Sequence, residues 1–344
     1  MKPSKPTSRD IAFKAGVSQA TVSRALRDSP EVRPETRRRV LEVARELNYR
    51  VDKNAAGLRS RQSHTLALLL FEDRTTDDSQ INPFFLSMLG SIARAAAAVN
   101  YDLLVSFQQL STNWHLRYEV SARADGIILL GYGDYITYGE KLRALDDAGA
   151  HYVIWGPELT GHSGHSVGCD NFDGMRQAVN HLLSLGRRNV AFVGHTSEHF
   201  PEFRQRYLGY VNALETVGIA LQDHLVAEAD NQEIAGYVAT KQLLAHGKAL
   251  DGIVCASDLI AIGCLRALQE TGHSVPSDVS LVGFDDIPAA AYVNPGLTTI
   301  RQDTRRAGEL LVHNLIGLIE EREPEQQHIP PRLVVRRSCG GHPR

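Results

Sequence analysis

The sequence predicts an α/β protein in which a small helical N-terminal domain precedes a larger two-lobed body of doubly wound parallel sheets. At 344 residues the chain is longer than one ordinary domain. Residues 1–61 carry 15 Lys and Arg against 7 Asp and Glu, whereas the remaining residues carry 22 against 33. From residue 63 onward, short apolar runs alternate with amphipathic helical stretches. A basic head joined to an acidic α/β body is typical of a polyanion-binding module fused to a second function.

Helices of the N-terminal domain can be placed from their caps and apolar spacing. Thr7 stands three residues before an aspartate, which is the spacing of a capping pair, so a first helix begins there and ends at Gly16. Ser18 then caps a second helix over Gln19–Leu26. A third helix over residues 34–49 closes the core, because its apolar residues recur at helical spacing.

The first two helices, joined by a glycine-containing turn, predict a helix-turn-helix. Such a module places the start of its second helix in the major groove of DNA. There Arg24 can donate two hydrogen bonds to a guanine, and Gln19 can read the edge of an adenine. The headpiece residues that we expect at the DNA are Thr7, Ser18, Gln19, Ala20, Thr21, Ser23 and Arg24.

The body contains eight apolar runs of strand length. They cover residues 65–71, 101–107, 125–131, 151–156, 189–195, 225–230, 251–257 and 279–286. Eight parallel strands are more than one compact open sheet of this type usually holds, so we expect two lobes with a cleft between them. Ligands of open α/β sheets bind beyond the carboxyl ends of the strands, which places a small-molecule site in that cleft.

Several motifs of the chain resemble one known family. Residues 7–26 are closely similar to the headpiece signature of the lactose/galactose repressor (LacI/GalR) family of bacterial transcription regulators, and residues 32–40 resemble that family's entry into its third helix. In the body, residues 170–174, 181–194, 206–210, 279–286 and 295–300 resemble further segments of the family. The resemblance implies a body like that of periplasmic sugar-binding proteins, used as an effector sensor.

The resemblance also implies domain boundaries and a hinge. We expect a headpiece over 1–50, a hinge over 51–62, a first effector-binding lobe over 63–163 plus 292–325, and a second over 164–291 plus 326–340. In the family the hinge folds into a short helix on operator DNA. The corresponding DNA contacts are Asn54, Ala55 and Leu58, with Leu58 as a wedge that opens a base step from the minor groove. This chain departs from the family at Val51, where proline is usual, and at Ala56, where arginine is usual.

Effector-binding residues implied by the resemblance lie at strand ends or in loops that face the cleft. Asp285 and Arg206 match the family's charged pair, since a carboxylate and a guanidinium can grip the hydroxyl groups of a sugar. Asp285 could instead cap a turn, and Arg206 could be a surface charge. The other expected contacts are Phe84, Phe85, Tyr132, Trp155, Asn231 and Ser257. Asn231 stands where family members commonly stack an aromatic side chain, and Trp155 suits a core position equally well.

Together these features predict a sequence-specific repressor of carbohydrate-metabolism genes whose effector, a sugar or glycoside, binds between the lobes. A nucleoside or purine is the alternative effector. A sugar-binding protein or an enzyme on the same body fold is the alternative from another class, and the basic headpiece argues against both. By resemblance the first lobe forms a homodimer, which would bind a near-palindromic DNA site.

The sequence predicts no metal site, no catalytic site and no membrane span. His162, His165 and Cys169 have the residue types of metal ligands, but they lie in a Gly- and Ser-rich stretch, so neither a metal nor another cofactor is expected. No nucleophile and base are arranged as an enzyme would need. The sequence contains no run of about 18 apolar residues, so no membrane-spanning helix is expected. Four cysteines without paired spacing fit reduced thiols in the cytoplasm.

Overall fold

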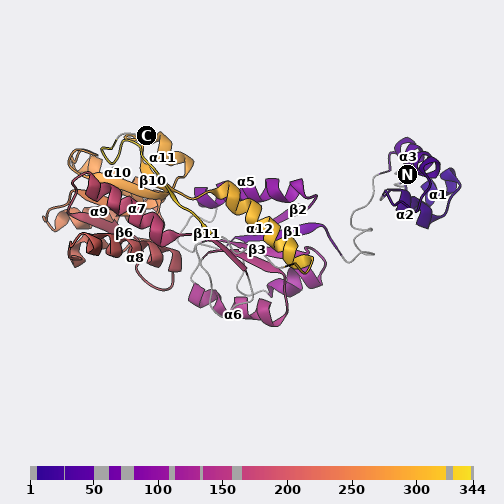
Figure 1. Ribbon diagram of the computed structural model, residues 1–344, viewed down its shortest axis with the longest axis horizontal. Helices are drawn as coiled ribbons and strands as arrows, with labels where there is room; N and C mark the ends of the chain where they lie inside the picture. Colours follow the sequence, from indigo (N-terminus) through magenta and orange to yellow (C-terminus); the bar gives the residue numbers. More distant parts are fainter. Residues whose placement is uncertain are drawn as a thin grey trace, which may run out of the picture. The chain divides into compact units, whose positions relative to one another are not determined.

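The computed structural model describes residues 6–26, 28–49, 62–70, 81–107, 113–131, 135–156, 165–322 and 328–341. The chain forms two compact units, Met1–Ser63 and His64–Arg344, which we call the headpiece and the body (Figure 1). The expected hinge contacts Asn54, Ala55 and Leu58 and the expected pocket residue Tyr132 lie outside the described residues. Among the helices that are described, none is both long enough and apolar enough to cross a membrane.

The headpiece consists of helices α1 (Ser8–Ala15), α2 (Gln19–Leu26) and α3 (Pro34–Glu46). The expected capping pair is present: the Thr7 N–H and hydroxyl both donate to Asp10 Oδ2 at 2.7 Å, and the Asp10 N–H donates to Thr7 Oγ1 at 3.4 Å. Gly16 ends α1 in the left-handed conformation, with a φ of 64°, which is costly for residues that have a Cβ. Ser18 caps α2 by accepting a hydrogen bond from the Thr21 N–H at 3.1 Å.

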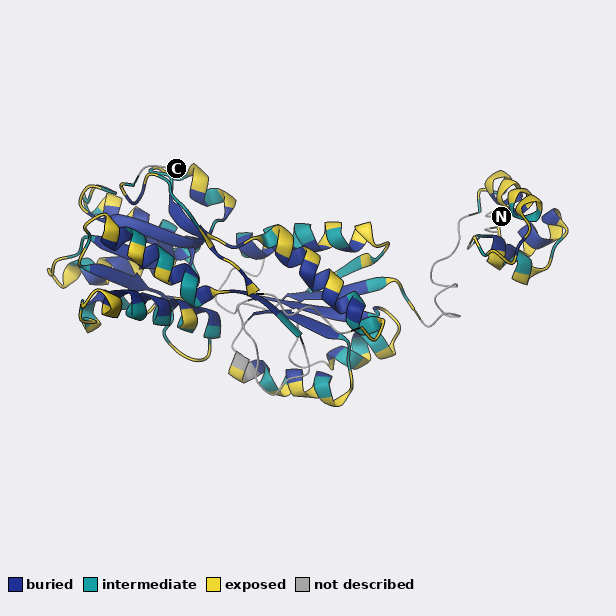
Figure 2. Cartoon of the chain, in the orientation of Figure 1, coloured by how far each residue is buried: buried dark blue, intermediate teal, exposed yellow. Residues whose placement is uncertain are grey.

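One apolar core joins the three helices of the headpiece. Ile11, Val22 and Val40, one from each helix, are fully buried in it. Each helix buries one stripe of side chains, and the rest of its surface is exposed or half-buried (Figure 2). The exposed residues of α2 are therefore held on a fixed scaffold.

The body contains two six-stranded sheets, one in each lobe. The first lobe's sheet, ordered β11-β5-β4-β3-β1-β2 and parallel throughout, consists of β1 (Thr65–Leu70), β2 (Asp102–Phe107), β3 (Gly126–Leu130), β4 (Tyr152–Trp155), β5 (His165–Cys169) and β11 (His328–Ile329). The second lobe's sheet, ordered β12-β10-β9-β8-β6-β7 and parallel except for β12, consists of β6 (Val190–Val193), β7 (Val226–Ala227), β8 (Gly252–Cys255), β9 (Ser280–Asp285), β10 (Thr298–Arg301) and β12 (Arg332–Val334). All eight apolar runs of the body form strands of these sheets, so the predicted fold class is confirmed.

Helices flank both sheets (Figure 1). The first lobe has α5 (Pro83–Ala98), the π-helix η1 (Leu116–Val120), α6 (Tyr135–Asp147) and α12 (Thr304–Ile319). The second lobe has α7 (Asn171–Ser184), α8 (Pro201–Thr216), the 3-10 helix η2 (Asp223–Leu225), α9 (Glu233–Ala245), α10 (Asp258–Glu270) and α11 (Pro288–Tyr292). Leu66 and Leu68 of β1 pack in the apolar cluster that includes α5 and α12, whereas Leu69 packs in the cluster that includes α6. Strand residues alternate between faces, and burial of both faces explains why this strand is a continuous apolar run.

Two glycines allow the helices of the second lobe to pack at close range. A Cβ added at Gly209 of α8 would collide with the backbone carbonyl of Phe172 in α7. A Cβ added at Gly263 of α10 would likewise collide with the carbonyl of Glu233 in α9. At these glycines the helix pairs α7–α8 and α9–α10 therefore approach each other backbone against backbone.

The connections between the lobes differ from the expected domain boundaries. The boundary at 163/164 assigned β5 to the second lobe, but β5 pairs with β4 in the first sheet. The boundary at 291/292 assigned β10 to the first lobe, but β10 pairs with β9 in the second sheet. The boundary at 325/326 likewise assigned β11 to the second lobe, but β11 pairs with β5 in the first sheet. All three expectations were wrong for one physical reason: a sequence pattern can predict a strand, whereas the strand's pairing partner depends on which sheet edge the folded chain reaches. The chain thus changes lobes after β5, after β10 and between β11 and β12.

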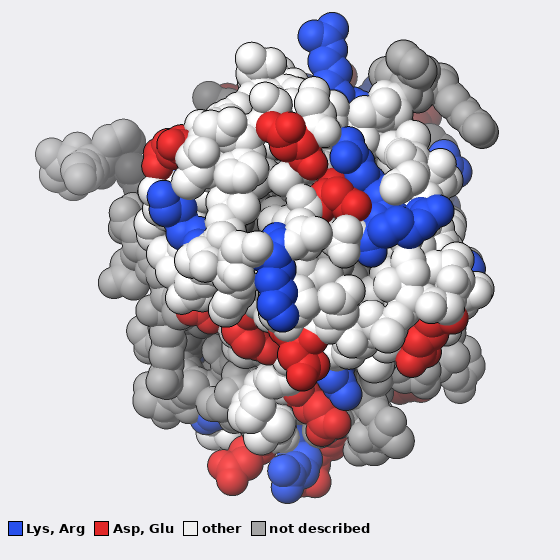
Figure 3. Space-filling view, turned by 90° about the vertical axis from the view of Figure 1, so that its left-hand side faces the viewer, with Lys and Arg blue, Asp and Glu red and all other residues white. Residues whose placement is uncertain are grey.

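Charge is distributed differently in the two units. Figure 3 shows the end of the body formed by the second lobe, where Lys and Arg side chains are interspersed with Asp and Glu. The sequence through residue 61 instead has 15 Lys and Arg against 7 Asp and Glu. Binding to a phosphate backbone depends on such an excess of basic residues. The N-terminal unit is therefore the part of the chain that we expect to bind nucleic acid.

Candidate functional site

The outer face of α2 displays the residues expected to read DNA. Gln19, Ala20 and Arg24 are exposed, because the two buried residues of the helix turn into the core. Arg24 Nε lies 3.0 Å from Glu31 Oε2, and the Gln19 side-chain amide donates to Ser8 Oγ at 3.0 Å. Of the other expected contacts, Thr7 and Ser18 are exposed and Thr21 and Ser23 are half-buried. The exposed face of the helix therefore presents the Gln19 amide at its start and the Arg24 cation in its last turn.

The second lobe holds a fully buried arginine, Arg206, at the centre of a polar cluster. Its Nε donates to Asn171 Oδ1 at 2.8 Å, and its Nη1 donates to the carbonyl of Ala256. The same Nη1 lies 3.5 Å from Asp285 Oδ1, and both side chains of this ion pair are almost inaccessible to solvent. A buried charge is tolerated only when it is paired and hydrogen-bonded, and Arg206 meets both conditions.

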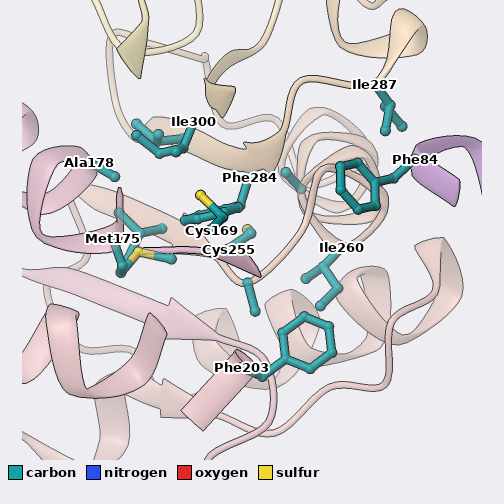
Figure 4. Packing of buried hydrophobic residues seen from close by; sticks show 14 of the residues in the cluster. Phe84, Cys169, Met175, Ala178, Phe203, Cys255, Ile260, Phe284, Ile287 and Ile300 are labelled. Atoms are coloured by element: carbon teal, nitrogen blue, oxygen red, sulfur yellow. The ribbon is translucent and has the colours of Figure 1, made fainter. Parts of the chain in front are cut away.

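Aromatic rings complete the environment of Arg206. Its guanidinium carbon lies 3.8 Å from the ring centroid of Phe284 and 5.1 Å from that of Phe203. Figure 4 shows both rings among the buried residues of the cluster, Phe284 from β9 and Phe203 from α8. Cations are attracted to ring faces at such distances, and desolvation strengthens the attraction. The guanidinium group of Arg206 is therefore held by polar contacts at its edge and by the two aromatic rings against its faces.

Asp285 is positioned by an unusual backbone turn at the end of β9. Asp285 and Asp286 have φ angles of 112° and 55°, a region that residues other than glycine rarely adopt. The turn is held by its side chains: Gln302 Nε2 donates to Asp285 Oδ1 at 2.7 Å, while Arg301 and Arg336 each contact an oxygen of Asp286 at 2.6 Å. Backbone strain of this kind persists only where the surroundings enforce it, and it concentrates at functional sites.

Phe84, at the start of α5, forms the aromatic part of the site in the first lobe. Its ring centroid lies 5.2 Å from that of Phe85 and 6.1 Å from that of Trp155. All three rings are buried, and Trp155 is only 2% exposed. A pocket of about 290 Å³ is lined by both lobes, with Phe84 on one side and Asp285 and Gln302 on the other. The structure thus brings expected effector residues of the two lobes to one cavity.

Comparison with known proteins identifies the family. A family model described as "Bacterial regulatory proteins, lacI family" matches residues 7–52, and one described as "Periplasmic binding protein-like domain" matches residues 179–339. The HTH-type transcriptional regulator RegA of Clostridium saccharobutylicum is 30% identical over 337 residues, which cover 96% of this chain and 98% of that protein. The chain belongs to the LacI family. It is therefore a DNA-binding transcription regulator and not an enzyme.

Solved structures of the LacI family match nearly the whole chain. The lac repressor dimer bound to operator and the anti-inducer ONPF is 25% identical, with a TM-score of 0.82 over 98% of this chain and 99% of that one. A complex of the transcriptional regulator CelR with cellobiose is 28% identical, with a TM-score of 0.72 over 97% of this chain and 99% of that one. The fold of headpiece and body is thus that of the LacI family.

The remaining effector residues expected from the LacI family occupy different environments. Ser257 is fully buried, and its hydroxyl accepts a hydrogen bond from the Ile260 N–H at 3.2 Å, so it caps α10. Asn231 follows β7 and is 8% exposed; its Oδ1 has no hydrogen-bond partner among the described residues. Trp155 packs against Phe84 instead of presenting an open face.

Burial raises the pKa values of two groups near the pair, Asp258 and Cys169. Burial raises the pKa of Asp258 well above its ordinary value, and the nearby Asp285 charge raises it further. The Asp258 oxygens accept hydrogen bonds from Thr299 Oγ1 at 2.6 Å and from the Ile287 N–H at 2.9 Å. Burial also raises the pKa of the Cys169 thiol to about 12. Both shifts favour the uncharged forms of Asp258 and Cys169.

Three partners of the charged pair were missed by sequence reasoning. Asn171 lies inside a motif that resembled the family, but the motif alone did not assign its side chain to Arg206. The Ala256 carbonyl and Gln302 gave no sequence signal, because a backbone acceptor and a connecting residue become partners only after the strands have paired.

The residues considered as metal ligands do not form a site in the described structure. His165 and Cys169 lie on β5, and His162 falls outside the described residues. Within the described part of the chain, no three His, Cys, Asp or Glu side chains are grouped so that they could hold a metal ion.

Proposed function

We propose that this chain is a repressor whose affinity for operator DNA is controlled by a sugar-class effector bound between the lobes. The observation that carries the proposal is the pocket of about 290 Å³ shared by Phe84 of the first lobe and Asp285 of the second. A ligand that contacts both lobes favours one lobe arrangement, and it changes DNA affinity through its differential affinity for those arrangements. The cellobiose complex of a relative supports a sugar or glycoside as the effector class.

The effector role is tested by Asp285→Asn, which keeps the shape of the side chain and removes its charge. We expect the variant to bind operator DNA nearly as the parent does, because the headpiece is a separate compact unit. Its response to cellobiose and related sugars should be lost. Fluorescence anisotropy on labelled operator measures both quantities, with Asp223→Asn, an exposed carboxylate of the same lobe, as the control. An unchanged sugar response in Asp285→Asn would show that Asp285 only supports the turn.

Base reading is proposed for the exposed residues of α2, with Arg24 as the main contact. Arg24→Ala should reduce affinity for the preferred operator by about 1–3 kcal/mol while affecting random DNA less. Arg38→Ala, which removes an exposed cation from α3, should weaken both DNAs to a similar degree. Equal losses on operator and random DNA in Arg24→Ala would make Arg24 a phosphate contact.

A homodimer formed through the first lobe is proposed from exposed apolar side chains. Leu86 of α5 is 54% exposed, and Val105 and Phe107 of the edge strand β2 are 43% and 44% exposed. Apolar residues gathered on one side of a lobe favour a protein partner, and a two-fold dimer places two headpieces on a near-palindromic site. Sedimentation velocity at micromolar concentration tests this, and a stable monomer or tetramer contradicts it.

We propose that the hinge transmits the effect of effector binding to the affinity for DNA. In a two-fold dimer, two Leu58 wedges would meet at one base step of the operator. We propose the headpiece at residues 1–50 and the hinge at 51–62, with the protein acting in the cytoplasm where operator DNA and metabolites are both present. Leu58→Ala should weaken operator binding and leave effector binding intact.

A further inference from the structure

The loop between α2 and α3 of the headpiece places an acidic side chain beside the helix that is proposed to read DNA bases. Glu31 lies in this loop, and its Oε2 is 3.0 Å from Arg24 Nε. The side chains of Arg24 and Glu31 are 53% and 68% exposed, so solvent screens their attraction and the pair adds little to stability. A negative charge next to this cation also opposes attraction to the phosphate backbone of DNA.

The loop that carries Glu31 is anchored to all three parts of the headpiece that surround it. The Ser29 N–H donates to the carbonyl of Arg24 at 3.0 Å, so the loop folds back onto the last turn of α2. From α3, Arg37 Nη2 donates to the Ser29 carbonyl at 2.7 Å. Val32, directly after Glu31, is 6% exposed and packs in the apolar core of the headpiece. The backbone therefore presents the Glu31 side chain from a fixed position.

The contact with Glu31 is compatible with reading of a guanine by Arg24. A guanidinium recognises guanine by donating two hydrogen bonds at once, to O6 and to N7 of the base. The two Nη nitrogens at the outer end of the group can supply both bonds, and Glu31 approaches Nε instead. A long arginine side chain loses rotational freedom when it binds, and part of that loss is avoided if a neighbour already holds it in the bound orientation.

Gln19, at the start of α2, is held from a neighbouring helix in a similar way. Its Nε2 donates to Ser8 Oγ at 3.0 Å, and Ser8 is a half-buried residue of α1. An amide nitrogen carries two hydrogens, so the second hydrogen and Oε1 can still pair with the edge of an adenine. Both long polar side chains that are proposed to read bases are therefore contacted by residues that lie outside α2.

We propose that Glu31 is a positioning residue for DNA recognition: it holds Arg24 in the orientation that reads a guanine, and it thereby raises the preference for operator over random DNA. This inference rests on the proposed base reading by Arg24. Holding the side chain in place strengthens the contact with the correct base. The negative charge of Glu31 weakens attraction to phosphates, which is the part of binding that does not depend on sequence. Both effects increase the ratio of operator affinity to random-DNA affinity.

The test uses the full chain and a DNA duplex that the protein itself selects. Selection from a library of random duplexes gives the preferred sequence. Each guanine of that sequence is then replaced in turn by 7-deazaguanine, which lacks the N7 acceptor, and fluorescence anisotropy measures the resulting loss of affinity. The guanine read by Arg24 is the one whose replacement weakens binding of the parent but not of Arg24→Ala.

Glu31→Gln keeps the size of the side chain and removes its charge. We expect the loss of affinity caused by 7-deazaguanine at the position read by Arg24 to shrink by at least about threefold, and the losses at other guanines to stay the same. Glu42→Gln, at an exposed position of α3, removes the same charge from another element and should change none of these losses. Thermal unfolding of both variants checks that the headpiece remains folded.

The outcomes separate this inference from the proposed base reading. If Arg24→Ala changes the loss at no guanine, base reading by Arg24 is wrong and the inference falls with it. If Arg24→Ala identifies a guanine but Glu31→Gln leaves the loss there unchanged, base reading stands and the inference is overturned. A larger loss in Glu31→Gln also overturns it, because Glu31 would then compete with the base for Arg24. In the Arg24→Ala background, Glu31→Gln should have no effect on any guanine, since the side chain that it positions is gone.

Discussion

The two lobes face their shared pocket with different chemistry. The first lobe contributes Phe84, whose ring packs against the buried rings of Phe85 and Trp155. The second lobe contributes Asp285, which is held by a hydrogen bond from Gln302 and by an ion pair with the buried Arg206. Apolar contacts depend on buried area and tolerate small displacements, whereas hydrogen bonds depend on direction.

This difference assigns different tasks to the two sides of the pocket. Polar groups that converge from several strand ends fix the orientation of a ligand and select its functional groups. An aromatic surface on the opposite lobe gains contact area as the lobes close, whichever way the ligand is turned. We therefore expect the second lobe to determine which effector binds and the first lobe to determine how strongly binding favours closure.

The largest expected effect is the loss of the buried cation in Arg206→Met. The substitution leaves the carboxylate of Asp285 buried without its partner, and breaking a buried pair in this way costs about 3–5 kcal/mol. Urea unfolding of the full chain measures the loss, with Arg305→Met, at a side chain that is 88% exposed, as the control. If Arg206→Met lowered the free energy of unfolding no more than Arg305→Met does, the second lobe would have to relax and admit water. The contrast between the lobes would then be weaker than the structure indicates.

A smaller effect is expected on the aromatic side from Phe84→Leu. The side chain stays apolar and only part of its volume is lost, so the free energy of unfolding should fall by roughly 1–2 kcal/mol. Sugars should bind more weakly by similar factors, because no directional contact is removed. Phe107→Leu, at an exposed position of β2, is the control. A change in the order of preference among sugars would contradict the division of tasks between the lobes.

The parts of this site that could be predicted from sequence are those encoded within single motifs. Arg206 and Asp285 each belong to a segment similar to the LacI family, so their side chains could be named before their contact was known. Asn171 and Gln302 could not be assigned, because both lie where the chain changes lobes. Their roles depend on β5 belonging to the first lobe's sheet and β10 to the second lobe's sheet, whereas the expected boundaries assigned each strand to the other lobe.

The fold could be predicted more fully than the site, for a related reason. Caps such as Thr7 and Ser18 act within one turn of helix, and all the information for them is local. Burial of Trp155 depends instead on Phe84, which approaches from a helix about 70 residues earlier in the chain. Strands and helix caps can therefore be predicted from the sequence, whereas the environments of side chains near the pocket depend on tertiary packing.

The smallest expected effect concerns the charged groups of the first lobe, which lie at the other edge of its sheet. His151 directly precedes β4, and its N–H donates to Glu119 Oε1 at 3.0 Å, while its Nδ1 lies 3.5 Å from Glu119 Oε2. This interaction with Glu119 raises the pKa of His151, and Asp125 and Glu321 add to the effect. The raised pKa means that protonated His151 stabilises the fold.

His151→Gln tests whether this network is separate from the pocket. The stabilisation is complete below the ordinary pKa of 6.5 and is lost as the pH rises through the raised value. His151→Gln should therefore lower the free energy of unfolding on the acid side by about 0.2–1 kcal/mol, since His151 is partly exposed, and by nothing on the alkaline side. Urea unfolding at several pH values measures this, with His246→Gln, at an exposed position of the second lobe, as the control. Because His151 precedes β4 at its amino end, whereas Trp155 contacts Phe84 at the carboxyl end of the strand, sugar affinity should not change. A shift in sugar affinity would show that polar groups of the first lobe also reach the effector, and the division between an aromatic and a polar side would fail.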